Sequence, residues 1–255
     1  MNSKLIKTGC CGFPVAREKY YKYFNCIEIN STFYQLPDLE TAEKWRKESP
    51  QEFEFIIKAW QLITHEPSSP TYRRLLKKIS DNKKKNYGYF KPTDEVFEAW
   101  EQTELFANVL YCNKIVFQCP SKFIPTKENI NNMIRFFNTI KKKNKKLYFI
   151  WEPRGNKWTS DEIKTLCSEL NLIHCVDPTV NRSVYGDFNY YRLHGKHSDG
   201  KIDYNYKFNL QELKNILKCC SKKQNYVMFN NMTMFDDALL FKKIGGLYAT
   251  KNIDY

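Results

Sequence analysis

Short runs of apolar and β-branched residues recur along the chain and are separated by stretches in which apolar residues have helical spacing. This alternation is typical of parallel βαβ units. The runs predict eight strands, at residues 5–9, 26–30, 53–58, 114–118, 147–151, 172–176, 190–193 and 226–229. Eight parallel strands with intervening helices close a (β/α)8 barrel of the TIM type, and we expect this α/β fold.

The segments between these runs predict helices at residues 17–24, 39–47, 93–111, 127–142, 160–170, 210–220 and 235–243. Two of them have clear start signals: Asp38 precedes one, and Thr159 precedes another whose first turn holds Asp161 and Glu162. Side-chain oxygens at these positions cap the first amides of a helix. Because no fixed-period repeat or Gly/Ser-rich linker interrupts the series, we expect one domain over residues 1–255.

The connection after the third predicted strand is longer than the others and spans about residues 59–92. Long loops at the rim of such barrels often cover the functional site. The sequence gives this connection no defined role.

Composition narrows the class of protein further. With 42% hydrophobic residues the chain can bury a large core. The first residues hold too short an apolar run for a signal peptide, and no run approaches the roughly 20 apolar residues that span a bilayer, so we expect a cytoplasmic protein without membrane contact. The nine cysteines are an odd number without a C-x-x-C pattern, which favours buried thiols over zinc or disulfide sites.

The formal net charge of +13 has two interpretations. Clustered Lys and Arg can neutralise nucleic-acid phosphates. Much of the excess, however, lies in lysine runs at residues 83–85 and 141–146, where solvated surface charge is the simpler explanation.

Polar side chains follow the predicted strands at the point where each ends. In a parallel barrel these carboxyl ends converge on the face that carries the chemistry. Residues two apart on a strand share a face, so neighbouring pairs can point into one site. The predicted catalytic residues are Glu28, Glu152, Asp177 and His194, and the predicted substrate-binding residues are Asn30, Lys58, His65, Gln118, Arg154, Arg192 and Asn230.

The same residues have a structural interpretation. Buried charge is costly unless it is paired, so the three carboxylates and the three cations among them can form a mutually satisfied network. For Glu28 and Lys58 we leave the structural and catalytic interpretations open. His174 precedes its strand end and is more typical of a satisfied core histidine.

At these motifs the chain resembles the YecE-like family, also called the domain of unknown function 72. The resemblance covers nearly the whole chain and rests on residues 9–13, 28–34, 55–59, 63–65, 117–120, 151–154, 191–195 and 229–231. It implies a TIM-type barrel with this rim as its site, and it supplies no reaction. Many relatives have Gly-Thr-Ser-Gly-Trp where this chain has Gly-Cys-Cys-Gly-Phe, so a hydroxyl at that position is absent here.

The favoured hypothesis is a hydrolase or lyase that acts on a phosphate-containing anion such as a nucleotide or nucleic acid. Lys58, Arg154 and Arg192 would hold phosphate oxygens, and His194 would act as general acid or base. No metal site is predicted and no cofactor is required, although Glu152 and Asp177 could hold one Mg²⁺ or Mn²⁺ ion.

Two other classes of function stay open. A non-catalytic nucleic-acid-binding protein would use the lysine-rich surface to contact phosphates. A carbohydrate-active enzyme would use Glu28 and Glu152 as its two carboxylates. The sequence leaves the oligomeric state undetermined.

Overall fold

The computed structural model describes residues 5–143, 146–198, 201–220 and 223–251. The chain divides into two compact units. The first contains the chain up to Glu28, Ser49–Glu54 and the chain from Ile173 onward, and the second contains Ile29–Glu48 and Phe55–Leu172. The predicted single domain over residues 1–255 stays a prediction.

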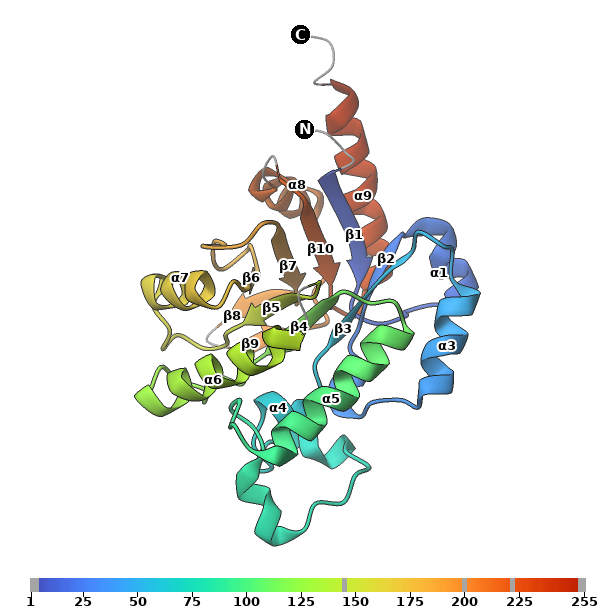
Figure 1. Ribbon diagram of the computed structural model, residues 1–255. Helices are drawn as coiled ribbons and strands as arrows, with labels where there is room; N and C mark the ends of the chain where they lie inside the picture. The colour runs from blue at the N-terminus through green and yellow to red at the C-terminus, as the bar shows by residue number, and fades with distance from the viewer. Residues whose placement is uncertain (1–4, 144–145, 199–200, 221–222, 252–255) are drawn as a thin grey trace. The chain divides into compact units, whose positions relative to one another are not determined.

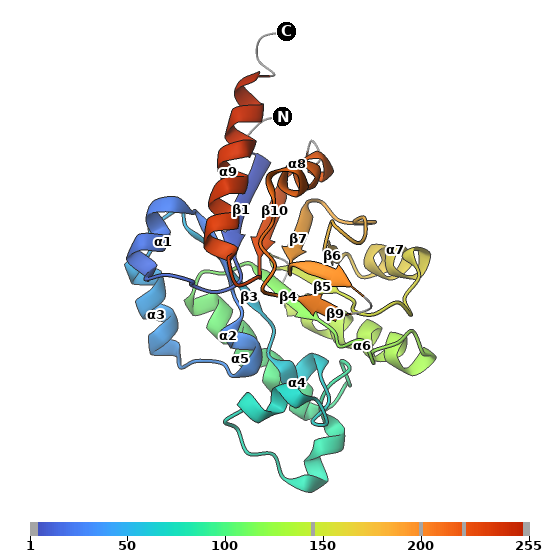
Figure 2. The ribbon, with the colours of Figure 1, turned by 180° about the vertical axis from the view of Figure 1, so that it is seen from behind.

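The first unit is built on parallel strands. They are β1 (Ile6–Cys10), most of β2 (Cys26–Ile29), β6 (Ile173–Val176), β7 (Asn189–Leu193) and β10 (Asn225–Phe229). In register, β1 pairs with β10, β10 with β7, and β6 with β7, and a parallel bridge joins Cys11 to Glu28. Helix α9 (Met234–Lys251) packs along β1 and β10, as Figures 1 and 2 show from opposite sides. Helices α1 (Arg17–Tyr23) and α8 (Leu210–Cys219) complete this unit, together with an antiparallel hairpin of β8 (Lys196–Ser198) and β9 (Lys201–Asp203).

The second unit contains most of β3 (Glu54–Lys58) and the parallel strands β4 (Lys114–Gln118) and β5 (Tyr148–Glu152) that follow it in the sheet. Its helices are α2 (Ser31–Tyr34), α3 (Leu39–Glu48), α4 (Gln61–Thr64), α5 (Asp94–Val109), α6 (Lys127–Lys143) and α7 (Ser160–Glu169), with 3-10 helices η2 (Pro70–Arg74) and η3 (Asp81–Asn86). The core of this unit is aromatic: Phe90 and Phe117 both contact Phe136 and Phe137. A core of this kind holds the carboxyl ends of its strands in fixed positions.

The strand order is β1-β10-β7-β6-β5-β4-β3-β2. Once the short β8–β9 hairpin is set aside, strands that follow one another along the chain are neighbours in this order, except β1 and β2, which stand at its two ends and are joined by the bridge from Cys11 to Glu28. This is the order of consecutive β/α units wound in one direction. The predicted (β/α)8 class is therefore confirmed.

Each predicted strand is present, and its ends agree with the prediction within one residue. The predicted caps are also confirmed: the Asp38 carboxylate accepts the Thr41 N–H, and Thr159 forms a reciprocal capping box with Glu162 at the start of α7. The short helices α2 and α4, the 3-10 helices and the β8–β9 hairpin were not predicted. All nine cysteines are free and most are buried, as expected. In the described part of the chain, no helix is both long enough and apolar enough to cross a membrane.

Candidate functional site

In the second unit, predicted site residues lie at the carboxyl ends of three strands. Lys58 ends β3, Gln118 ends β4 and Glu152 ends β5. Gln118 and Glu152 are register partners, so they occupy the same level of the sheet. Just beyond β5, the Arg154 guanidinium Nη2 lies 2.7 Å from Glu152 Oε1, and the Arg154 side chain is 21% exposed.

Lys58 is held against an aromatic ring. Its ammonium lies 3.8 Å from the centroid of the Phe33 ring, and the Lys58 residue is 6% exposed. Helix α2 presents Phe33 and is tied to the strand end because Thr32 Oγ1 contacts the carbonyl oxygens of both Ile29 and Lys58 at 2.7 Å. A cation–π contact of this kind positions a partly desolvated ammonium without neutralising its charge.

His65 packs edge-on against the same Phe33 ring, with 4.8 Å between ring centroids. It follows α4, its N–H donates to the Gln61 carbonyl, and its Nδ1 lies 2.8 Å from Thr64 Oγ1. The Tyr72 hydroxyl donates to the His65 carbonyl at 2.7 Å. The ring and the backbone of His65 are therefore both fixed.

Burial, followed by the positive charges of Lys58 and Arg154, lowers the pKa of His65 to about 3. At neutral pH this imidazole is uncharged. We name Lys58, His65, Glu152 and Arg154 the cationic cluster, because two of its side chains are cations. Such a cluster favours an anion, and Arg154 can offer the planar donors that match phosphate or carboxylate oxygens.

In the first unit, Glu28 and Arg192 form a closed pair. Arg192 Nε lies 3.0 Å from Glu28 Oε2, Arg192 Nη2 lies 2.8 Å from Glu28 Oε1, and neither side chain is exposed. The Tyr190 hydroxyl donates to Glu28 Oε2 at 2.8 Å, and burial raises the pKa of Tyr190 well above its ordinary value. Because these groups satisfy one another, the geometry supports the structural interpretation of Glu28.

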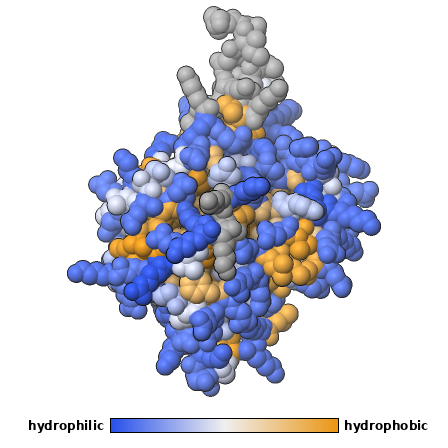
Figure 3. Space-filling view, viewed as in Figure 1, coloured by the Kyte–Doolittle hydropathy of each residue, from blue (hydrophilic) through white to orange (hydrophobic). Residues whose placement is uncertain are grey.

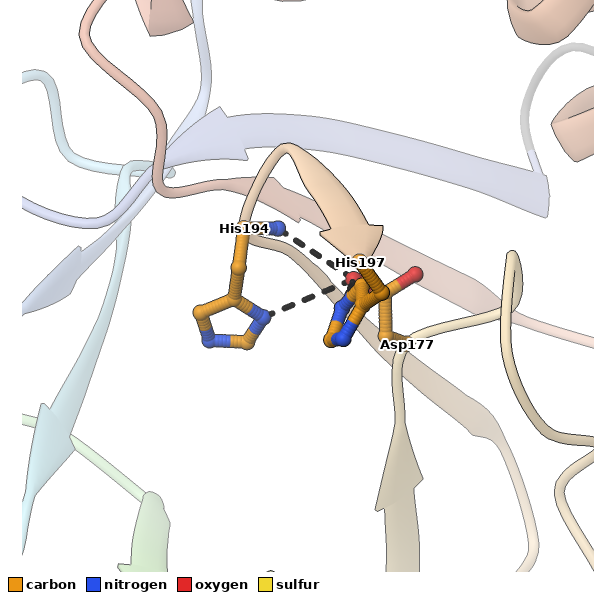
Figure 4. A group of neighbouring side chains, drawn as sticks. All are labelled: Asp177, His194 and His197. Atoms are coloured by element: carbon orange, nitrogen blue, oxygen red, sulfur yellow. Dashed lines mark hydrogen bonds and ion pairs between the residues drawn. The ribbon is translucent and has the colours of Figure 1, made fainter. Parts of the chain in front are cut away.

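A second group in this unit lies where β6 and β7 end. His197 Nε2 lies 3.1 Å and His194 Nδ1 lies 3.6 Å from the same carboxylate oxygen of Asp177, Oδ2 (Figure 4). Burial opposes ionisation of Asp177, but hydrogen bonds from His194 and Thr179 outweigh it and lower the pKa of this carboxyl. Asp177, His194 and His197 form a group that could hold a metal ion.

A cavity of about 380 Å³ adjoins this group in the same unit. Its lining includes His197, Arg182, Lys196, Tyr206, Glu212 and Cys219. The Glu212 carboxylate accepts from the Tyr206 hydroxyl at 2.5 Å, and Arg182 Nη1 lies 2.6 Å from the Cys219 sulfur. The volume is within the range of small-molecule sites.

Several predicted site residues are thus brought together, in three groups. The cationic cluster contains four of them, Glu28 pairs with Arg192, and Asp177 lies beside His194. Asn30, Gln118 and Asn230 are half-buried at strand ends, and the Asn230 N–H donates to the Leu193 carbonyl at 2.7 Å. His174 is buried and accepts the Val184 N–H at 3.2 Å, as expected for a core histidine.

Sequence reasoning missed His197. It lies in β8, whereas His194 directly follows the end of β7. Gly195 forms the turn between the two histidines. Gly195 has φ +111, and a Cβ there would collide with the Asp203 carbonyl oxygen, so this turn requires glycine. The sequence feature that could have indicated His197 is its position three residues after His194, with Gly195 between them.

The fold and these groups define a (β/α)8 protein with charged and imidazole side chains at the ends of its strands. The family described as protein of unknown function DUF72 matches residues 16–246, and the chain belongs to this family. The chain is similar to the UPF0759 protein YunF of Bacillus subtilis (strain 168), with 25% identity over 255 residues that cover 87% of this chain and 82% of that protein.

Two solved structures illustrate the fold. A DUF72 family protein from Enterococcus faecalis V583 is 17% identical, with a TM-score of 0.69, 94% of this chain covered and 95% of that chain. Endonuclease IV from Thermus thermophilus is 8% identical, with a TM-score of 0.55, 96% of this chain covered and 99% of that chain. At these identities the likeness shows the fold alone.

Proposed function

We propose that the protein is an enzyme, a hydrolase or lyase, that acts on a phosphate-containing anion such as a nucleotide or nucleic acid. The observation that carries the proposal is the cationic cluster. It brings Lys58 and Arg154 near an imidazole that stays neutral, and the Arg154 side chain is partly exposed. A phosphate group would supply the anionic oxygens that the Arg154 guanidinium and the Lys58 ammonium can bind.

In this proposal Arg154 binds two phosphate oxygens through its guanidinium, and Lys58 contributes a point charge to a third. A neutral His65 can donate one hydrogen bond to the developing charge of the transition state without needing to lose a proton. Glu152 orients Arg154, and Gln118 and Asn30 are further donors.

The proton transfers are proposed for the predicted catalytic residues. Within the unit that holds the cationic cluster, Glu152 is the candidate for general acid or base. A single divalent ion such as Mg²⁺ or Mn²⁺ is compatible with this chemistry. Of the two carboxylates predicted to hold it, Glu152 is paired with Arg154, whereas Asp177 lies beside two imidazoles.

The likeness to endonuclease IV favours a nucleic-acid substrate only as an analogy between folds, since one barrel fold supports many reactions. It helps to choose the substrates for the first assay. Phosphodiesters and phosphomonoesters both belong in that assay.

Turnover of bis(p-nitrophenyl) phosphate and p-nitrophenyl phosphate tests the proposal. We expect the protein to hydrolyse one of them, and Arg154→Ala to lower kcat/KM by about 100-fold, the effect of losing one preorganised donor to the transition state. Arg154→Lys, which keeps a cation beside Glu152 but lacks the planar fork, should recover only part of the loss.

The matched control is Arg135→Ala, which removes an exposed arginine from α6 in the same unit. Its kcat/KM should equal that of the wild type. Equal turnover by wild type and Arg154→Ala, or no turnover of either ester, would contradict the proposal.

A second candidate function is non-catalytic binding of nucleic acid, and one surface favours it. Between residues 66 and 92 the chain carries eight Lys and Arg residues against two acidic ones. Hydrophilic side chains cover this part of the molecule in Figure 3, at the bottom of the view. The exposed cations are Arg73, Arg74, Lys78, Lys83, Lys84 and Lys85. Binding by this surface would be strongly salt-dependent.

A further inference from the structure

The geometry at the ends of β6 and β7 points to a second kind of chemistry. We propose that Asp177, His194 and His197 bind a divalent first-row transition-metal ion. The three residues lie in one unit, and one ligand atom from each lies within 4.8 Å of the others. This proposal does not rest on phosphate binding by Lys58 and Arg154.

The spacing of the donor atoms fits a shared ion. With metal–ligand bonds of about 2.1 Å, two donors lie about 3.0 Å apart at a right angle and about 3.4 Å apart at the tetrahedral angle. Asp177 Oδ2 lies 3.1 Å from His197 Nε2 and 3.6 Å from His194 Nδ1. Both separations from the carboxylate oxygen are therefore within a few tenths of an ångström of those that a shared ion requires.

The carboxylate is held in the orientation that ligation needs. Asp177 Oδ1 accepts from the Thr179 N–H at 3.0 Å and from Thr179 Oγ1 at 2.6 Å. These bonds fix the carboxylate and direct Oδ2 toward the imidazoles. Hydrogen bonds to the other oxygen of a ligating carboxylate are characteristic of metal sites.

A simple ion pair between Asp177 and histidine explains less of this geometry. One such pair needs one imidazole, whereas here Nδ1 of His194 and Nε2 of His197 both approach the same oxygen (Figure 4). The two rings come from different positions on the chain, and the tight turn at Gly195 brings the second one back. A shared ion explains why both imidazole rings approach the same oxygen of Asp177.

The donor set indicates the class of metal. Two imidazole nitrogens and one carboxylate oxygen suit Zn²⁺, Co²⁺, Mn²⁺ or Fe²⁺ better than Mg²⁺ or Ca²⁺, which favour all-oxygen sites. Three protein ligands also leave at least one coordination position for water or a substrate atom, as in catalytic zinc sites.

The adjoining cavity indicates which kind of ligand such an ion would bind. His197 lines the cavity and is also a proposed ligand. Two further lining residues, Arg182 and Lys196, have no carboxylate within ion-pair distance in the described ranges of the chain. An anionic ligand that coordinates the ion would fit this charge. A His194 Nδ1 that binds a metal ion cannot also act as a general acid or base. Metal binding would therefore assign His194 the role of a ligand.

Titration of the chelator-treated full chain with Co²⁺ tests the proposal. We expect one equivalent of Co²⁺ to bind and give visible absorption bands of a nitrogen- and oxygen-ligated ion, and Zn²⁺ to displace it. His197→Ala is the variant of choice because its side chain is 31% exposed and its loss should leave the fold intact. We expect this change to weaken Co²⁺ binding by more than about tenfold, since even changes to residues that only orient a ligand cost roughly 10- to 100-fold.

Asp187→Asn, which alters an exposed carboxylate of the same unit, is the control and should bind Co²⁺ as the wild type does. Three results would overturn the proposal. They are the absence of stoichiometric binding, equal affinity in His197→Ala, and a near-ultraviolet sulfur-to-cobalt band, which would assign the ion to one of the cysteines instead.

Discussion

Replacing Glu28 by Gln should lower the free energy of unfolding by about 3–5 kcal/mol, the usual cost of removing one partner of a buried ion pair. Arg192 then keeps its charge at a site with no exposed surface and loses the Glu28 carboxylate. The Tyr190 hydroxyl also loses a charged acceptor. Denaturation in urea at pH 7, with the slope m checked for constancy, measures the change.

A double-mutant cycle separates the pair from the rest of the core. Glu28→Gln combined with Arg192→Met removes both charges, so the double variant should be more stable than the sum of the two single changes predicts. The exposed pair of Lys84 and Asp81 is the comparison. Asp81→Asn should leave the unfolding free energy unchanged, because exposed pairs contribute little. Additive effects of the two buried changes would contradict a coupled pair.

Acidification should destabilise the wild type more than a variant that lacks His65. The pKa of His65 falls from an ordinary 6.5 to about 3 on folding. Below pH 6.5 the imidazole is therefore protonated in the unfolded chain but stays unprotonated in the folded protein. Stability from this residue is therefore present above pH 6.5 and is lost as pH falls toward 3. The slope approaches about 1.4 kcal/mol per pH unit for one proton.

Urea denaturation of the wild type and of His65→Gln at pH 7, 6 and 5 tests this expectation. Other carboxyl groups titrate in both proteins, so the difference between the two slopes isolates His65. We expect the wild type to lose about 1–2 kcal/mol more than the variant between pH 7 and pH 5. Parallel pH profiles would show that the folded imidazole accepts its proton normally.

The strands could be predicted because each is a short apolar run that ends in a polar residue, as Phe55 to Lys58 illustrates. Helices α2 and α4 could not, because four residues are too few to show a helical period. Their effect on the site is large, since α2 supplies Phe33 beside Lys58 and α4 positions His65.

The types of residue at the site were predictable, but their pairing was not. Sequence position alone treats Arg154 and Arg192 as equivalent rim arginines. In the structure Arg192 is closed off by Glu28, whereas Arg154 is partly exposed. The low pKa of His65 likewise depends on burial and on two cations, one of them far from it in the chain.

Calorimetric titration with inorganic phosphate tests most directly the central claim that the cationic cluster binds phosphate. We predict one site per chain, with affinity reduced at least about tenfold in Lys58→Met, since a hydrogen bond to a charged group contributes about 1.5–3 kcal/mol. Lys47→Met on α3 should bind as the wild type does. Equal phosphate affinity in Lys58→Met would contradict the claim. So would binding confined to oligonucleotides and weakened by Lys83→Ala, Lys84→Ala and Lys85→Ala together, which would identify the basic surface as the functional one.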